Sequence, residues 1–200
     1  MKTQKNEILI NELLDQTETI LKKAIAEWQL IPHYKFALRP SPEGWSANEC
    51  LQHLNSYGRY YLPAIEKSIA QVKNSNPTDE FSSGWLGNYF TKLMLPTKEG
   101  KLSKKMKSPK NHTPKTIIES HIVITEFIDQ QEKLLQLLTL AKKIDLNKSK
   151  VGISIAPFIK LKLGDVFMFL IAHIVRHTQQ AERALGKKSE VIEAQTLSLG

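Results

Sequence analysis

The sequence is poor in cysteine and has no long apolar run. Its 200 residues include a single cysteine, Cys50, which excludes an internal disulfide framework and a multi-cysteine zinc site. The longest uninterrupted apolar stretch, Val166 to Ala172, is too short to span a bilayer. The residues that follow Met1 are polar or charged and lack the apolar core of a signal peptide. We therefore expect no membrane span and a cytoplasmic location.

Glycine and proline are not abundant, at 9 residues each, whereas 41% of the residues are hydrophobic. This composition excludes a collagen-like or disordered chain and is sufficient for one sizeable core. We expect a single domain over residues 1–186, followed by a short tail over residues 187–200.

The net charge of +8 is concentrated in one segment. Six lysines and one glutamate lie between Lys98 and Lys110, so this segment alone carries a net charge of +5 (six minus one). It contains no arginine and no aromatic residue with which to read or stack on bases. A solvated basic loop is therefore the favoured interpretation, and a site for nucleic acid or another acidic partner is the alternative.

Four long segments carry apolar residues at steps of three and four, the spacing of amphipathic helices. They are residues 6–28, 47–72, 114–138 and 164–185. A shorter helix is expected near residues 85–95, and residues 151–155 fit either a short strand or an extended loop. We predict an all-α protein: an up-down four-helix bundle with long connecting loops and one extra short helix.

Capping signals mark several helix ends. Ser46 and Glu49 have the spacing of a capping box, which predicts that the second long helix begins at Ala47. Thr113 and Pro114 offer an N-cap and a first-turn proline for the third, and Gly186 is the expected stop of the fourth. The long irregular connection over residues 74–113 indicates either a crossover between distant helix ends or a cover over a site.

Three histidines occupy helix faces that should be buried. His173 and His177 are one turn apart in an apolar row, so they can bind one ion as a pair, and His53 lies on the apolar stripe of the second long helix. Three converging neutral imidazoles would hold a divalent ion and leave positions open for water or substrate. The alternative is three core histidines, each of which needs its own hydrogen-bond partner.

The other histidines are weaker candidates. His33, in a proline-bounded loop, and His112, at the end of the basic loop, are expected to be exposed. His121 falls on the apolar stripe of the third long helix and is a candidate fourth ligand, although one imidazole with one hydrogen-bond partner explains it more simply.

Two motifs carry a family resemblance. Residues 44–54 read Gly-Trp-Ser-Ala-Asn-Glu-Cys-Leu-Gln-His-Leu, and residues 173–180 read His-Ile-Val-Arg-His-Thr-Gln-Gln. They resemble the Trp-Ser-x-x-Glu-x-x-x-His-Leu signature and the closing His-x-x-Arg-His-x-x-Gln helix of the DinB-like (YfiT-like) superfamily of metal-dependent enzymes. The resemblance implies a four-helix bundle with a divalent ion on His53, His173 and His177. It also implies a thiol-dependent S-transferase or isomerase, or a hydrolase, and often a homodimer.

Several neighbours of the histidines have two interpretations each. Glu49 is a candidate base or hydrogen-bond acceptor, but the capping box explains it better. Gln180, three residues after His177, is a second candidate catalytic residue within reach of the site, whereas Arg176 is expected to point elsewhere, toward a carboxylate or a subunit contact.

Tyr57 and Cys50 also have both a functional and a structural interpretation. Tyr57 could offer its hydroxyl to a ligand, but a core aromatic residue is favoured. Cys50 could ligate the metal or act as a nucleophile, but a small buried side chain is favoured. A cluster of aromatic residues is expected either to plug the end of the bundle or to line the mouth of a pocket: Trp85, Tyr89 and Phe90.

Three functions follow, in order of preference. The first is a metal-dependent enzyme, a hydrolase or a low-molecular-weight-thiol S-transferase, acting on a small-molecule substrate with zinc or nickel, or alternatively iron or manganese. The second is a non-catalytic bundle that its metal only stabilises. The third is a nucleic-acid or acidic-partner binder that uses the Lys98 to Lys110 loop.

Overall fold

The computed structural model describes residues 3–72, 78–95, 107–114 and 118–187. Within these residues the chain is overwhelmingly helical, which confirms the all-α class. The long helices are α1 (Asn6–Ala26), α3 (Ala47–Gln71), α5 (Ser120–Ala141) and α6 (Leu163–Ala184); α2 (His33–Phe36) and α4 (Trp85–Met94) are shorter. The strands are β1 (Thr3–Lys5), β2 (Glu80–Ser82), β3 (Lys150–Ile153) and β4 (Ala156–Lys162).

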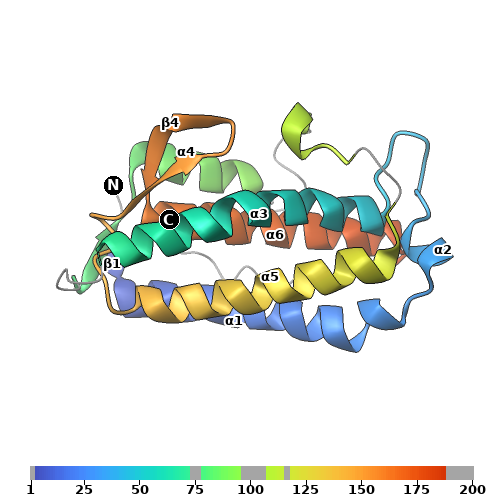
Figure 1. Cartoon of the computed structure of the whole chain (residues 1–200), viewed down its shortest axis with the longest axis horizontal. Coiled ribbons are helices and arrows are strands. Elements are labelled where there is room, and N and C mark those ends of the chain that lie inside the picture. Colours follow the sequence, from blue (N-terminus) through green and yellow to red (C-terminus); the bar gives the residue numbers. More distant parts are fainter. Residues whose placement is uncertain (1–2, 73–77, 96–106, 115–117, 188–200) are drawn as a thin grey trace.

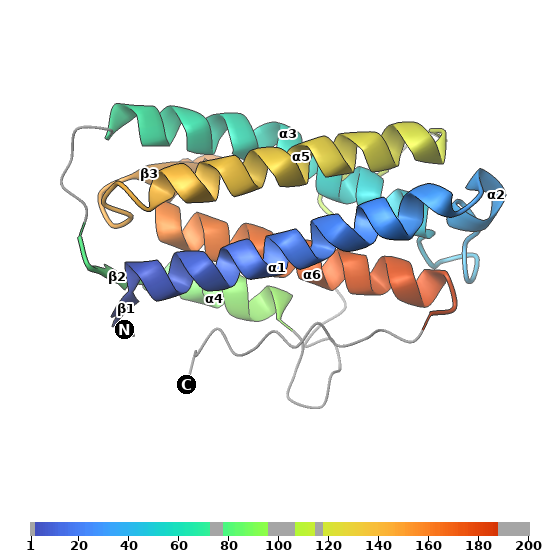
Figure 2. The same ribbon diagram turned by 90° about the horizontal axis from the view of Figure 1, so that it is seen from below.

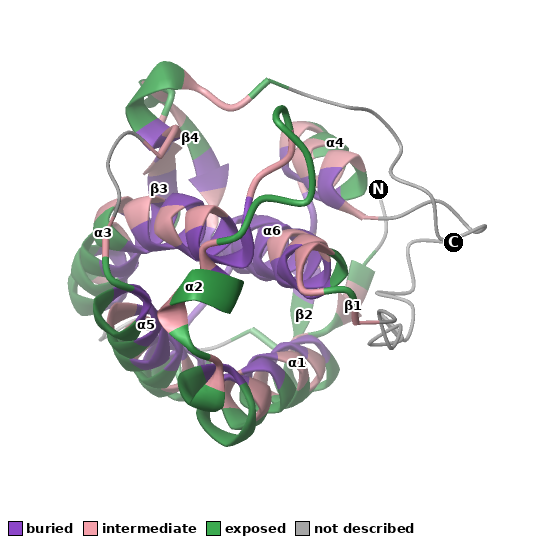
Figure 3. Ribbon diagram, turned by 90° about the vertical axis from the view of Figure 1, so that its right-hand side faces the viewer, coloured by how far each residue is buried: buried purple, intermediate pink, exposed green. Residues whose placement is uncertain are grey.

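The four long helices lie side by side around one core (Figure 1, Figure 2). Helix α5 packs against α1 and α3, and α6 packs against the same two helices from the other side. The end-on view shows their buried residues facing inward, where apolar burial stabilises the bundle (Figure 3).

The helices do not alternate strictly in direction. Helices α1 and α6 run one way along the bundle, and α3 and α5 run the opposite way (Figure 2). Parallel neighbours cannot be joined by a short turn, because the chain must return along the whole length of α3, about 37 Å for 25 residues. The long connection between α3 and α5 is therefore a crossover between distant helix ends.

Helices α3 and α5 approach each other closely despite the long connection. The side chain of the buried Asn55 donates to the carbonyl of Val123 at 2.9 Å. Gly58 makes room for the side chain of Gln130 from α5, because a methyl group there would lie 1.8 Å from its Oε1 atom.

The start of the third long helix differs from the prediction. Helix α5 begins at Ser120, whereas Thr113 donates its hydroxyl to the Pro109 carbonyl at 3.0 Å, within a separate turn. The ring of His33 in α2 caps the helix instead, because its Nδ1 accepts the Ser120 N–H at 3.1 Å. By contrast, α3 begins at Ala47 behind the predicted capping box.

Two short strand pairs complete the fold. The stretch near residues 151–155 forms an antiparallel hairpin of β3 and β4, and β1 pairs with β2 in a contact that the sequence did not reveal. The hairpin and α4 cover α6 on the side away from α1, which is why α6 is buried nearly all round (Figure 3). The short helix predicted near residues 85–95 is α4.

The predicted stop after α6 is confirmed, since Gly186 adopts a positive φ of 71°. Lys187, the first residue of the predicted tail, pairs with Glu27, while residues 188–200 lie outside the described residues. Most of the basic loop, residues 98–106, also lies outside them. No helix in the described part of the chain is both long and apolar enough to cross a bilayer.

Candidate metal centre

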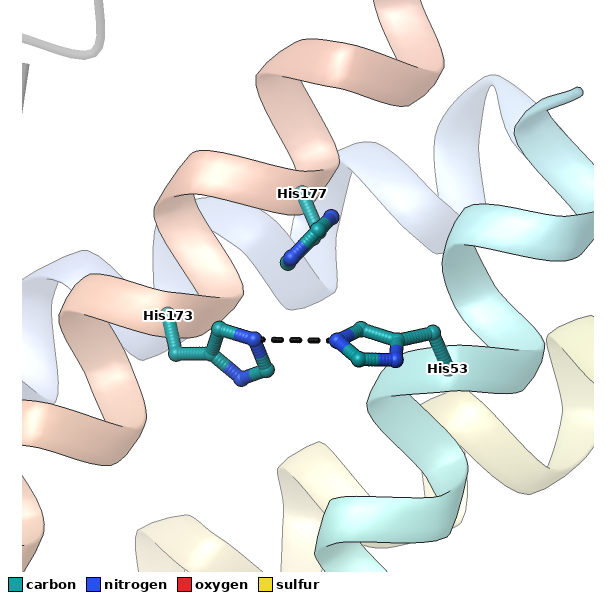
Figure 4. A group of neighbouring side chains, drawn as sticks. All are labelled: His53, His173 and His177. Carbon is teal, nitrogen blue, oxygen red and sulfur yellow. Dashed lines mark hydrogen bonds between the residues drawn. The ribbon is translucent and has the colours of Figure 1, made fainter. Parts of the chain in front are cut away.

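Helices α3 and α6 bring the three predicted histidines together. His53 lies on the second turn of α3, and His173 and His177 lie one turn apart on α6, with all three rings turned toward a common point (Figure 4). One ligand atom from each lies within 4.8 Å of the others. The Nε2 atoms of His53 and His173 are 3.1 Å apart, close to the separation of about 3.3 Å for two nitrogens on a tetrahedral ion.

Two of the rings have their tautomer fixed from outside the group. The Nδ1–H of His53 donates to the backbone carbonyl of His112 at 2.7 Å, and the Nδ1–H of His177 donates to Oε1 of Gln180 at 3.0 Å. In a neutral imidazole this leaves Nε2 unprotonated, and the Nε2 of His53 accepts the Nε2–H of His173 in the hydrogen bond drawn in Figure 4. The Nδ1 of His173 has no hydrogen-bond partner among the described residues.

Burial keeps these imidazoles neutral. His53 and His173 are 2% and 3% exposed. Loss of hydration lowers the pKa of His53 to about 4 and that of His177 to about 3, and it lowers the pKa of His173 well below its usual value. All three rings therefore offer lone pairs at neutral pH, which is the form that binds a metal ion.

Aromatic side chains wall the histidines and hold their orientation. Trp45 stacks on His177 with ring centroids 6.0 Å apart, and Phe169 stacks on His173 at 5.8 Å. Tyr57 is a buried aromatic residue, as favoured, and its ring centroid lies 4.4 Å from that of His173. Burial raises the pKa of its hydroxyl, so Tyr57 is neutral at neutral pH.

The prediction for His112 was wrong. Its side chain is buried rather than exposed, and its ring centroid lies 3.9 Å from that of Tyr57. It lies in the short turn Lys110–His112 (η2), which the crossover places on α3. Local sequence holds no signal for this contact, because 59 residues separate His53 from His112.

The remaining histidines stay outside the group. His121, the candidate fourth ligand, is exposed at the start of α5 rather than buried. His33 is partly exposed and caps α5.

Glu49 and Cys50 have structural contacts. Glu49 forms both bonds of the capping box with Ser46, and its carboxylate also pairs with Arg39. Burial alone would raise the pKa of Glu49, but the hydrogen bonds from Arg39 and Ser46 hold it below its usual value. The Cys50 thiol is fully buried, burial raises its pKa, and it is not part of the histidine group.

The other predicted neighbours of the histidines lie on α6 and α4, and their contacts match the predictions only in part. Gln180 reaches the site through its bond to the His177 ring. Arg176 points away from it, as predicted, but donates to the Leu93 carbonyl at 3.1 Å. Of the predicted aromatic cluster, Trp85 and Tyr89 are 75% and 54% exposed and do not plug the bundle, whereas Phe90 packs against the core, with its ring centroid 6.1 Å from that of Phe169.

Comparison with known proteins identifies one family. A family model described as DinB superfamily matches residues 14–181, a span that contains both sequence motifs and all three histidines. Neither a curated protein nor a solved structure matches the chain.

Proposed function

The chain belongs to the DinB superfamily, and from this premise and the histidine geometry we propose that it is a metal-dependent enzyme. His53, His173 and His177 would hold one divalent ion, with zinc or nickel as the favoured metals. The observation that carries the proposal is the arrangement of the rings: three neutral imidazoles share one centre, and two of them have Nδ1 occupied by an acceptor outside it.

The donor set decides which chemistry is available. Neutral imidazoles add no negative charge, and Glu49 is engaged with Ser46 and Arg39. When bound, a divalent ion in such a site lowers the pKa of a coordinated water or thiol toward neutrality. This favours hydrolysis or transfer of a low-molecular-weight thiol, on a small-molecule substrate.

The protein's own groups would orient the histidines and exclude water. Gln180 holds the His177 ring by accepting its Nδ1–H, so we assign it orientation and not proton transfer. Trp45, Tyr57 and Phe169 surround the rings with apolar surface, which strengthens electrostatic interactions inside the site. We include a homodimer in the proposal, to be tested by light scattering.

The test is elemental analysis of untagged protein purified without chelator. We expect one divalent ion per chain in the wild type and in the control variant His121→Ala, and loss of the ion in His53→Ala and in His177→Ala. Absence of metal in the wild type, with no uptake on titration, would refute the proposal. Circular dichroism of each variant shows whether the bundle remains folded.

A second function is favoured by one observation, the near-complete burial of His53 and His173. An ion held there without access for a substrate would only stabilise the bundle. In that case chelation would lower the melting temperature, and neither hydrolytic nor thiol-transfer substrates would be turned over.

A further inference from the structure

The η2 turn makes contacts that the proposed function does not use. Its residue His112 is 5% exposed, and both nitrogens of its ring have partners. Nδ1 lies 2.9 Å from the hydroxyl of Ser56 in α3, and Nε2 lies 3.0 Å from the hydroxyl of Ser154, at the turn between β3 and β4. The ring of His112 therefore ties the crossover to a long helix and to the hairpin.

The direction of each hydrogen bond follows from its partners. The Ser56 hydroxyl donates to the carbonyl of His53 at 2.7 Å, so its oxygen is left to accept the Nδ1–H of His112. The Nε2 of a neutral His112 then accepts the hydroxyl hydrogen of Ser154.

A second hydrogen bond joins α3 and the η2 turn in the opposite direction, from α3 to the turn. The Nδ1–H of His53 donates to the backbone carbonyl of His112. His112 is thus bonded to α3 twice: its carbonyl accepts from the ring of His53, and its own ring donates to the hydroxyl of Ser56. The backbone N–H of Ser154 donates to the hydroxyl of Tyr61 at 3.1 Å, so the hairpin turn that holds the His112 ring is itself bonded to α3.

We propose that His112 is a positioning residue for the metal centre. Its ring, anchored by Ser56 and Ser154, holds its own carbonyl against His53, so that the Nε2 of His53 points at His173. The proposal rests on the proposed function, because it assumes that His53 is a ligand. Metal-binding histidines depend on such an acceptor for their tautomer and orientation.

The two fixed histidines differ in what holds their acceptors. Gln180 lies three residues from His177 on the same helix, so local geometry is enough to place it. The nearer acceptor for His53, the His112 carbonyl at 2.7 Å against 3.4 Å for the Ser108 hydroxyl, lies on a three-residue turn and depends on side-chain anchors from two other elements. Loss of these anchors should therefore act on His53 selectively.

A fourth-ligand role for His112 does not fit these contacts. Both of its ring nitrogens are engaged by serine hydroxyls, and it is not part of the group whose ligand atoms converge.

The experiment compares zinc affinity across variants of the full chain, by competition with a chromophoric chelator, and records the absorption spectrum of the cobalt-loaded protein. His112→Ala keeps the backbone carbonyl but removes the ring that anchors it, so we expect it to weaken the Kd by about 10-fold, the lower end of the effect of losing such a partner outright. Ser154→Ala removes one neutral hydrogen bond and should weaken it by about two- to tenfold.

A rescue and a control separate positioning from general stability. His112→Asn places an amide N–H near the position of Nδ1, so it can still donate to Ser56 and should recover part of the affinity and the wild-type cobalt spectrum. The control, His33→Ala, removes the ring that accepts the Ser120 N–H at the start of α5, away from the histidine group. It should lower the melting temperature and leave the Kd unchanged.

The outcomes distinguish the two proposals. A wild type that binds neither zinc nor cobalt overturns both. A wild type that binds, together with His112→Ala and Ser154→Ala variants of unchanged Kd and spectrum, overturns the role of His112 alone. If His112→Ala does not fold, Ser154→Ala decides: a weaker Kd supports the role, and an unchanged Kd overturns it.

Discussion

The stability of the metal-free protein should fall as the pH falls, because the histidine group is buried in its neutral form. The pKa of a histidine is ordinarily near 6.5, and in the fold it is about 4 for His53 and about 3 for His177. Between these values the unfolded chain binds protons that the folded chain does not. The contribution of the neutral histidines to the free energy of unfolding is therefore complete above about pH 6.5, and it is lost as the pH decreases toward the folded-state pKa values of about 4 and about 3.

The size of the effect follows from the same values. At about pH 5 an unfolded histidine is protonated about 30 times more often than it is neutral, whereas His53 and His177 remain largely neutral in the fold. Each of these two rings therefore lowers the free energy of unfolding by about 2 kcal/mol between about pH 7.5 and about pH 5. His173, whose pKa is also lowered, adds to the loss.

The assay is urea denaturation followed by circular dichroism, in the presence of a chelator, at about pH 7.5 and about pH 5. The variant His177→Gln should lose about 2 kcal/mol less than the wild type over this range, whatever its stability at the higher pH. The control His121→Gln, which changes an exposed ring, should behave as the wild type does. Equal pH dependence in the wild type and in His177→Gln would refute the reasoning.

Three further substitutions test individual contacts. Glu49→Gln keeps the capping box and removes only an ion pair, so it should cost at most about 1 kcal/mol and leave zinc affinity unchanged; weaker zinc binding would contradict the structural assignment. Gly164→Ala places a methyl group 2.6 Å from the fully buried ring of Phe81, and calorimetry should show a loss of about 1–3 kcal/mol; no loss would mean that the ring moves freely. Lys23→Met leaves the 5% exposed carboxylate of Glu182 unpaired and should lower the free energy of unfolding, measured by urea denaturation, by about 3–5 kcal/mol. The double variant Lys23→Met/Glu182→Met should restore most of this loss.

Helical periodicity predicted the elements that carry the candidate site. The apolar steps around His173 and His177 mark the buried face of α6, and the capping box behind Ser46 sets the register that turns His53 inward. These signals are readable because they arise within one or two turns of a helix. The same reasoning failed for His121, since an apolar stripe at a helix start says little about which neighbour covers it.

The apolar run in α6 also carries a signal about how this helix packs. The run from Val166 to Ala172 is too short to cross a bilayer, but seven consecutive apolar residues on a helix indicate that the helix has no solvent-exposed face. The structure shows the reason, since the hairpin and α4 cover the side of α6 that the bundle leaves open.

Local sequence signals were sufficient to predict the helical class, the extent of most helices and the three histidines that converge. Four features became visible only in the folded chain: the parallel course of α3 and α5, the pairing of β1 with β2, the cap that His33 supplies to α5 and the placement of His112 against His53. The division has a physical cause. Periodicity and capping depend on residues a few positions apart, whereas each of these contacts joins segments far apart in the chain and forms only when the whole bundle packs.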